Sequence, residues 1–258
     1  MKDNKNRQKR KKTGAEKEQI FINISTKILV AVTLIVAVVY AVISIKNQFS
    51  SSGLKALEEL GKEPDTSTII TRPITDELYT SLNTKITNSG FDILVDGDID
   101  YEKFCQTTIA INDNLSLASN ELGLLYNSIH LTNPDKYSMI VKQIDTEVIS
   151  NGYKLKIVCT VDMRTLFPSV PDVPARVYIT SESEIKSGVI TPLKTIYNNM
   201  STSLSDELST AINDQEDKPN IQNYIPSLIV NFMKNIVQKT DTTLSVSNNQ
   251  VAFNLKTA

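Results

Sequence analysis

The chain has 258 residues, which is enough for one large domain or two small ones. Apolar residues make up 40% and charged residues 22%, proportions that are typical of a chain with a packed core and argue against a disordered one. The formal net charge is only −2, but it is unevenly distributed. Residues 1–27 hold nine Lys or Arg and three acids, a charge of +6, whereas the remainder holds 18 basic and 26 acidic residues, a charge of −8.

The basic arm is followed by an uncharged run, ILVAVTLIVAVVYAVISI, at residues 28–45. A helix of this length is about 27 Å long, close to the hydrocarbon thickness of a bilayer. Lys27 and Lys46 bracket the run and can snorkel to the two interfaces. Two alternatives to a membrane helix are a buried core helix and a cleaved signal peptide. A core helix of this length would show a polar face. The apolar part of a signal peptide is shorter, about 7–15 residues, and is followed by an A-x-A-like cleavage site. We therefore expect an uncleaved transmembrane helix at 28–45.

The basic arm also sets the expected orientation. Positive charge beside a membrane anchor stays in the cytoplasm, so residues 1–27 are expected inside the cell and the rest of this single-pass chain outside. The membrane is thus an expected partner, and the arm can touch anionic lipid headgroups. Contact of KNRQKRKK with nucleic acid or with another protein is the alternative. Topology explains the charges without it, so no nucleic-acid partner is expected.

Residues 46–70 are expected to form a stalk, because FSSSG is flexible and GKEPD stops a short LKALEEL helix. Residues 71–258 then form the extracytoplasmic domain. Its first half is expected to alternate helices with strands. Residues 137–149 and 153–163 form the clearest hairpin, with a turn at Asn151-Gly152 and with one apolar and one polar face. The other expected elements here are helices at 75–88 and 119–131 and strands at 91–95 and 105–111.

The second half is expected to contain strands at 173–179 and 185–190, followed by a long helix from Thr191-Pro192 to Ile212. A helix at 223–238 carries the strongest amphipathic pattern of the chain. A last hairpin turns at Asn248-Asn249. The expected fold class is therefore α+β, with a transmembrane helix and an exported domain whose curved, mostly antiparallel sheet packs against long amphipathic helices.

One phrase occurs three times, as TDELYTSLN at 75–83, SNELGLLYN at 119–127 and SDELSTAIN at 205–213. A Ser or Thr followed by acidic or amide residues and then Leu is typical of a helix start, where the side chain caps the helix and the dipole favours negative charge. The third copy lies inside the long expected helix, so capping does not explain Ser205.

The sequence DGDIDYE at 96–102 invites comparison with a calcium-binding loop. An EF-hand starting at Asp96 needs Gly at its sixth position and Glu at its twelfth, where this chain has Tyr101 and Thr107. We therefore interpret Asp96-Gly97 as a turn flanked by solvated acids, and no metal site is predicted.

His130 is the only histidine and is interpreted as structural, because no nucleophile motif accompanies it. No phosphate-binding glycine motif is present, and neither a catalytic residue nor a cofactor is predicted. Cys105 and Cys159 both fall on the apolar parity of their expected strands. They could pair outside the cell, but two buried thiols are the favoured interpretation.

The apolar helix stripes are the remaining candidate site. By default they cover a sheet and fill a core, and the functional alternative is a groove for an acyl chain. The residues proposed for that groove are Leu193, Ile196, Tyr197, Met200, Leu228, Phe232 and Ile236.

The expected anchor, the short [ST]-x-E-L helices, the hairpins and the stretch SGVITPLKTIYNNMSTSLSDEL together resemble bacterial extracytoplasmic proteins with a tubular, BPI-like lipid-binding fold. In particular, residues 70–215 are similar to anchored envelope proteins of the YpmS type from Gram-positive bacteria. The last helix and hairpin have no counterpart in that family. The resemblance implies a curved sheet wrapped on a long helix that holds lipid in an apolar groove, and it implies no catalytic residues.

The leading hypothesis is thus a non-enzymatic membrane protein whose exported domain binds an apolar ligand, such as lipid, at the cell envelope. The alternative is a scaffolding subunit of an envelope assembly, with protein partners, a fully packed core and no ligand. An enzyme that uses Asp96, Asp98, Asp100 or His130 ranks third.

Overall fold

The computed structural model describes residues 51–130, 139–165, 175–213 and 220–256. Residues 49–258 form one compact unit. The expected arm and transmembrane helix, residues 1–45, lie outside the described ranges. Within those ranges, no helix has the length and apolar character needed to cross a bilayer.

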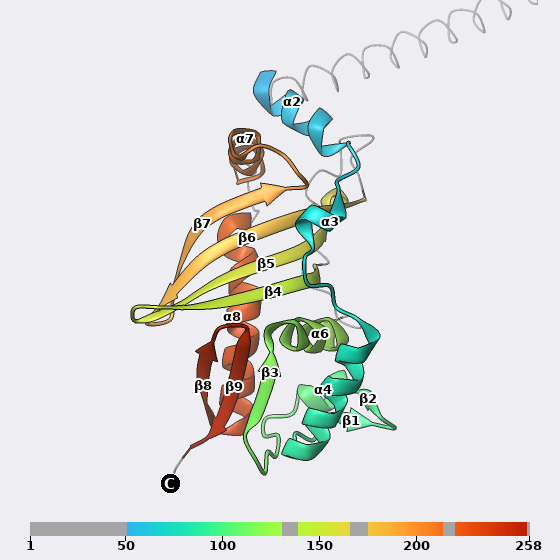
Figure 1. The fold of residues 1–258 in the computed structure, drawn as a ribbon, viewed down its shortest axis with the longest axis vertical. Helices are drawn as coiled ribbons and strands as arrows, with labels where there is room; N and C mark the ends of the chain where they lie inside the picture. The colour runs from blue at the N-terminus through green and yellow to red at the C-terminus, as the bar shows by residue number, and fades with distance from the viewer. Residues whose placement is uncertain (1–50, 131–138, 166–174, 214–219, 257–258) are drawn as a thin grey trace, which may run out of the picture. The chain divides into compact units, whose positions relative to one another are not determined.

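The described residues form an α+β fold with antiparallel sheets (Figure 1). In chain order the elements are α2 (Ser51–Leu60), α3 (Thr66–Ile69), α4 (Asp76–Ser89), β1 (Leu94–Val95), β2 (Asp98–Ile99), α5 (Tyr101–Phe104), β3 (Leu115–Ala118), α6 (Ser119–His130), β4 (Ile140–Ile149), β5 (Gly152–Asp162), the 3₁₀ turn Met163–Thr165, β6 (Arg176–Lys186), β7 (Val189–Tyr197), α7 (Thr202–Asn213), α8 (Ile221–Thr240), β8 (Thr242–Ser247) and β9 (Gln250–Leu255).

The largest sheet is a meander in the order β4-β5-β6-β7, and a second sheet has the order β3-β9-β8. The predicted hairpin of β4 and β5 is confirmed, with Ile149 opposite Gly152 and Asn151 at a φ of 63°. Gly152 itself lies in β5. A Cβ there would stand 2.0 Å from the carbonyl oxygen of Ile185, so this glycine allows β6 to approach.

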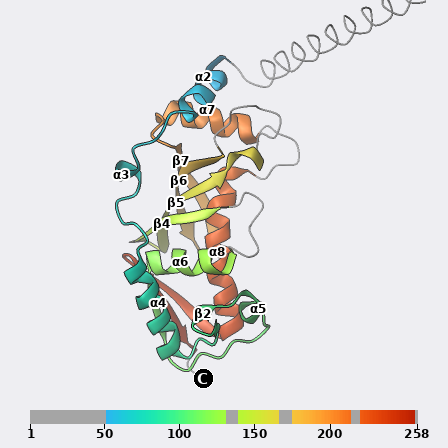
Figure 2. The ribbon, with the colours of Figure 1, turned by 90° about the vertical axis from the view of Figure 1, so that its right-hand side faces the viewer.

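Helix α8 covers one face of the large sheet, as Figures 1 and 2 show together. Its predicted amphipathic stripe is confirmed, because its apolar face is buried against the sheet and against α5 and α6. The buried α8 residues include Ile225, Ile229, Phe232, Met233 and Ile236. The opposite face of the sheet carries polar and charged residues, as alternation along a strand requires.

The prediction of a helix from Thr191 to Ile212 is wrong over its first half. Residues 189–197 continue the β6 hairpin as β7, and α7 starts only at Thr202. β-branched residues dominate the strand, and Pro192 is accommodated because β7 is an edge strand with a bulge at this point. Within the described part of the predicted strand at 173–179, residues 176–179 begin β6, and the strand predicted at 185–190 spans the turn between β6 and β7.

The predicted strand at 105–111 is also wrong. Asp100 caps the short helix α5, with its carboxylate accepting from the Lys103 N–H at 2.7 Å, and residues 105–111 then run without a strand partner. The strand predicted at 91–95 shrinks to β1. The predicted helices at 75–88, 119–131 and 223–238 and the final hairpin are confirmed to within a few residues, over the described part of each.

The repeated phrase has a structural role at its last position. Its three asparagines, Asn83, Asn127 and Asn213, all bond with a side-chain amide to the backbone of a later segment. Ser205 of the third copy lies within α7 and is buried, and its hydroxyl accepts from the Tyr197 N–H at 3.4 Å. The last residue of the phrase therefore ties its helix to a segment that follows in the chain.

Candidate functional site

The polar face of the large sheet carries charges of alternating sign. Alternate residues of a strand point to the same face, so register partners across neighbouring strands form a row. One such row consists of Asp145, Lys156, Glu182 and Lys194, and a second of Glu147, Lys154 and Glu184. The two rows give this face closely spaced positive and negative groups.

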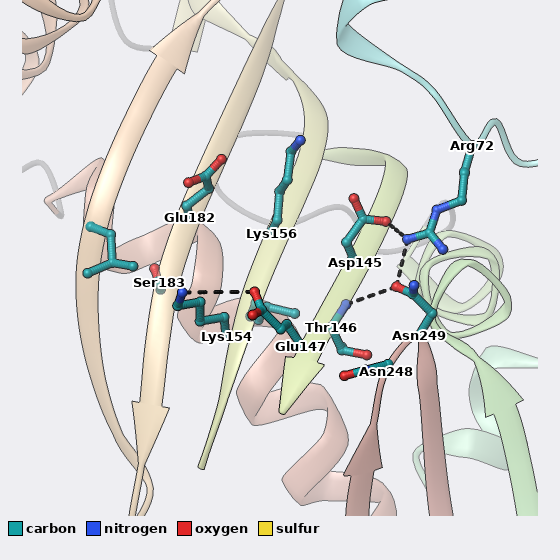
Figure 3. Close-up of a pocket in the computed structure, with 12 residues that line it drawn as sticks. Arg72, Asp145, Thr146, Glu147, Lys154, Lys156, Glu182, Ser183, Asn248 and Asn249 are labelled. Carbon is teal, nitrogen blue, oxygen red and sulfur yellow. Dashed lines mark hydrogen bonds and ion pairs between the residues drawn. The ribbon is translucent and has the colours of Figure 1, made fainter. Parts of the chain in front are cut away.

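A cavity of about 510 Å³ lies along these rows, and we call it the polar groove. Figure 3 shows Asp145, Lys156 and Glu182 pointing to the same side from three neighbouring strands. The groove is lined by Arg72, Asp145, Thr146, Glu147, Lys154, Leu155, Lys156, Glu182, Ser183, Leu193, Asn248 and Asn249.

Arg72 closes one end of the groove. Its guanidinium pairs with Asp145 and donates to the side-chain oxygen of Asn249 at 2.6 Å (Figure 3). The buried side chain of Gln143 accepts from the backbone N–H groups of Thr71 and Arg72, both at 2.9 Å. This end of the groove is therefore held in place by a network that includes the backbone of the segment preceding α4.

The middle of the groove holds charges that are not neutralised by neighbours. Lys156, Glu182 and Lys194 form no ion pair with any residue in the described ranges. Lys154 reaches only to 3.9 Å of Glu147, and both side chains are largely exposed, so this pair contributes little. A ligand with groups of both signs would find partners here.

A second cavity, of about 370 Å³, continues along the same face. It shares Lys156 and Glu182 with the polar groove and adds Lys194, while Thr68 and Ile69 of the α3 segment also line it. The charged row is thus accessible over the width of three strands.

The residues predicted to line an apolar groove have different environments within the described part of the chain. Tyr197, Met200, Phe232 and Ile236 are buried. The Tyr197 hydroxyl lies 3.2 Å from Ser209 Oγ of α7, and the Phe232 ring packs against Phe104 of α5 and Tyr126 of α6. Leu228 and Ile196 are half-buried, whereas Leu193 is 51% exposed and lines the polar groove. Ile196 and Met200 line the second cavity.

The acidic stretch 96–102 forms the turn that the sequence predicts, with Asp96 and Gly97 at positive φ between β1 and β2. Asp98 accepts from the Tyr79 hydroxyl at 2.9 Å. Burial of the phenol raises the pKa of Tyr79, and the hydrogen bond to Asp98 raises it further. Among the described residues, no group of three or more His, Cys, Asp or Glu is placed to hold a metal ion.

His130 ends α6, where its ring stacks on Tyr126 with centroids 4.1 Å apart and meets Phe232 edge-on. Its Nδ1 lies 3.0 Å from the Tyr126 carbonyl oxygen. These contacts place the imidazole in the aromatic cluster beneath α6.

No disulfide joins the two cysteines. Cys159 is buried on the apolar face of β5, as its parity predicts, but Cys105 follows α5 and is exposed. The prediction that Cys105 faces the core is wrong because the strand that would have carried it does not form.

The groove residues were not predicted from the sequence as a site. The alternation of Lys154 and Lys156 with apolar residues does indicate a polar sheet face. The register that places Asp145 and Glu182 beside Lys156, and the return of Arg72 and Asn249 to the same place, depend on long-range pairing that no local pattern encodes.

In comparisons with known proteins, no family model, curated protein or solved structure matches the chain.

Proposed function

We propose that the chain is a non-enzymatic, single-pass protein of the cell envelope whose extracytoplasmic body is a scaffolding module that holds a partner in the polar groove. One contrast carries this proposal. The central residues of the expected apolar site, Tyr197 and Phe232, are buried, whereas the polar groove is open and is lined by charged side chains. Two of these, Lys156 and Glu182, form no ion pair with any described residue.

The chemistry of the groove favours an extended polar partner that carries both signs of charge. Lys156 and Glu182 are adjacent in the register, so ammonium and carboxylate groups of a peptide segment can meet both at once. At the other end of the groove, the Arg72 guanidinium already bonds to Asn249 within the chain, so this end closes the groove and does not bind the partner. Such rim-exposed charges govern specificity and association rate more than affinity.

A photo-crosslinking amino acid in place of Lys156 tests this proposal in the full chain in its own membrane. We expect a discrete protein adduct, identified by mass spectrometry, that is lost when Lys194 and Glu182 are reversed in sign. The same photo-probe at Asn88, an exposed position on α4, is the control. An identical adduct pattern at both positions would show that the groove has no partner of its own.

Lipid binding is the second proposal. It is favoured by the arrangement of a 20-residue helix, α8, along one face of the large sheet. A sheet curved around a long helix is what the resemblance to BPI-like proteins implies. Here the acyl chain would have to open the packed core, because the groove residues Phe232 and Ile236 are buried, with Phe232 packed against aromatic rings of α5 and α6.

The membrane anchor is supported by the uncharged run at 28–45 and by the +6 charge of the preceding arm. We propose that residues 1–27 are cytoplasmic and that the body lies outside. In a Cys105→Ser background, a membrane-impermeant maleimide should label Asn88→Cys in intact cells and Arg10→Cys only after permeabilisation. Labelling of Arg10→Cys in intact cells would overturn the topology.

A further inference from the structure

Both edges of the large sheet are closed by the rest of the chain. At the β4 edge, the N–H groups of Val141, Ile144, Thr146 and Val148 all donate to asparagine side chains. The four acceptors are Asn127, Asn120, Asn249 and Asn248, at 2.9, 2.8, 3.3 and 3.0 Å.

At the β7 edge, Pro192 has no N–H, a bulge interrupts the register, and the Tyr197 N–H donates to Ser205. Such features prevent another strand from pairing there.

The edge strand β3 of the smaller sheet is also protected. It has only four residues, and its Ala118 N–H donates to the Glu121 carboxylate at 2.7 Å. Helix α4 packs beside it. Of the longer sheet edges in the described ranges, the outer side of β8 is therefore the one left to consider.

The hydrogen-bond pattern shows which β8 groups point outward. The Leu255 N–H donates to Asn114 on the β3 side, at 2.7 Å, so odd-numbered β9 residues face β3 and even-numbered ones face β8. The register then makes Thr243, Ser245 and Ser247 the partners that bond β9. The backbone groups of Leu244 and Val246 consequently point away from the sheet, and no described residue bonds to them. Figure 1 shows β8 at the outer side of its sheet.

The strand itself lacks the features that protect exposed edges. Its sequence, TTLSVS, contains no charge and no proline, and its pairing with β9 runs over six residues without a bulge. Leu244 and Val246 are half-buried on one face, and Thr243 and Ser245 are exposed on the other. A regular, uncharged edge of this kind is a template for strand addition.

We propose that β8 pairs antiparallel with β8 of a second copy of this chain, centred on Ser245, so that two three-stranded sheets become one of six strands. This register bonds the outward groups of Leu244 to those of Val246 in the other copy, in both directions. The same strand suits itself as a partner because no like charges meet. Asp241, the nearest acid, comes opposite Asn249 of the second copy.

Cysteine crosslinking of the full chain in membranes tests the proposal. The two Ser245 residues would form a non-hydrogen-bonded pair, with Cα atoms about 4.5 Å apart, which a disulfide can span. In a Cys105→Ser background we expect Ser245→Cys to give mostly covalent dimer on mild oxidation. Thr243→Cys, on the same strand and face and also exposed, faces Ser247 instead and should give at least fivefold less.

Mixing differently tagged Thr243→Cys and Ser247→Cys chains should restore the crosslink. Dimer yields for Ser245→Cys no greater than for Thr243→Cys would overturn the proposal, as would self-crosslinking of Thr243→Cys alone. Because a crosslink can trap a rare encounter, the mass of the detergent-extracted chain is also measured by light scattering. We expect a dimer for the original chain and for Thr243→Lys, and a monomer for Ser245→Lys, which sets two ammonium groups against each other. A monomeric original chain contradicts the proposal, and circular dichroism confirms that both variants fold.

Discussion

The side-chain amide of Asn127 on α6 bonds both backbone groups of Val141 on β4. Its Nδ2 donates to the Val141 carbonyl oxygen at 2.8 Å, and the Val141 N–H donates to its Oδ1 at 2.9 Å. Asn120, two helical turns earlier, accepts from the Ile144 N–H. Seven helical residues span about 10.5 Å and three strand residues about 10 Å, so the helix and the strand edge match in length.

Replacing Asn127 with alanine removes two hydrogen bonds and leaves two backbone groups of a buried residue without partners. We expect a loss of roughly 2–4 kcal/mol in the free energy of unfolding, measured by urea denaturation. The Val141 amide should also exchange its hydrogen faster. Asn88→Ala, at an exposed position on α4, should stay within about 0.5 kcal/mol of the original chain. Equal costs at the two positions would refute the edge-capping role.

Glu121 and Lys85 couple α6 to α4. The Glu121 side chain is 1% exposed and accepts from Lys85 Nζ at 2.5 Å, from Ser81 Oγ at 2.5 Å and from the Ala118 N–H at 2.7 Å. Lys85→Met leaves this carboxylate without its cation. Because the Lys85 side chain is 37% exposed and water screens the pair, we expect a cost of about 1–3 kcal/mol, below that of a fully buried pair.

A double-mutant cycle isolates this interaction. In a Glu121→Gln background, Lys85→Met should cost less than about 0.5 kcal/mol, because no buried charge is left uncompensated. An unchanged cost in the two backgrounds would mean that Lys85 acts only through packing of its side chain.

Asp162 gives the fold a pH dependence. Hydrogen bonds from Arg164, the nearest at 2.7 Å, hold the pKa of the Asp162 carboxyl below its usual value. A depressed folded-state pKa stabilises the fold above the unfolded value of about 3.9, and the contribution is lost as the pH falls through the folded value. Asp162→Asn should therefore melt at a lower temperature than the original chain at pH 7, with a difference that vanishes in acid. A difference independent of pH would contradict this assignment.

Gly152 is expected to tolerate no side chain. A Cβ at this position meets the backbone of Ile185, so Gly152→Ala must push β5 and β6 apart and should destabilise the chain by about 2–4 kcal/mol. Gly61→Ala is the matched control, since its Cβ would come no nearer than 3.4 Å to any atom. Thermal denaturation compares the two. A Gly152→Ala variant as stable as Gly61→Ala would show that the sheet adjusts.

Local sequence patterns were sufficient for α4, α6 and α8 and for the β4-β5 and β8-β9 hairpins, because periodic burial and turn residues act over short distances. They failed at Thr191-Pro192. A capping threonine followed by proline is typical of a helix start, but an adjacent β6 supplies partners for a strand, and tertiary pairing outweighs that preference.

The candidate site was harder to predict than the fold. The apolar residues proposed as a groove, such as Tyr197 and Phe232, have the pattern of a core and are buried as one. The polar groove brings Arg72, Lys156 and Asn249 together from segments far apart in the chain. The proximity of these three residues depends on strand register and on the position of the final hairpin. Neither can be derived from a single local motif.

The central claim is that the body is a packed scaffold with a polar groove and not a container for lipid. Native mass spectrometry of the full chain, released from its membrane in mild detergent, tests it most directly. We predict masses that correspond to protein subunits alone, with any adduct removed by gentle activation. A stoichiometric lipid that stays bound, and that is lost when Phe232 or Ile236 is changed to a smaller residue in a variant that still folds, would contradict the account.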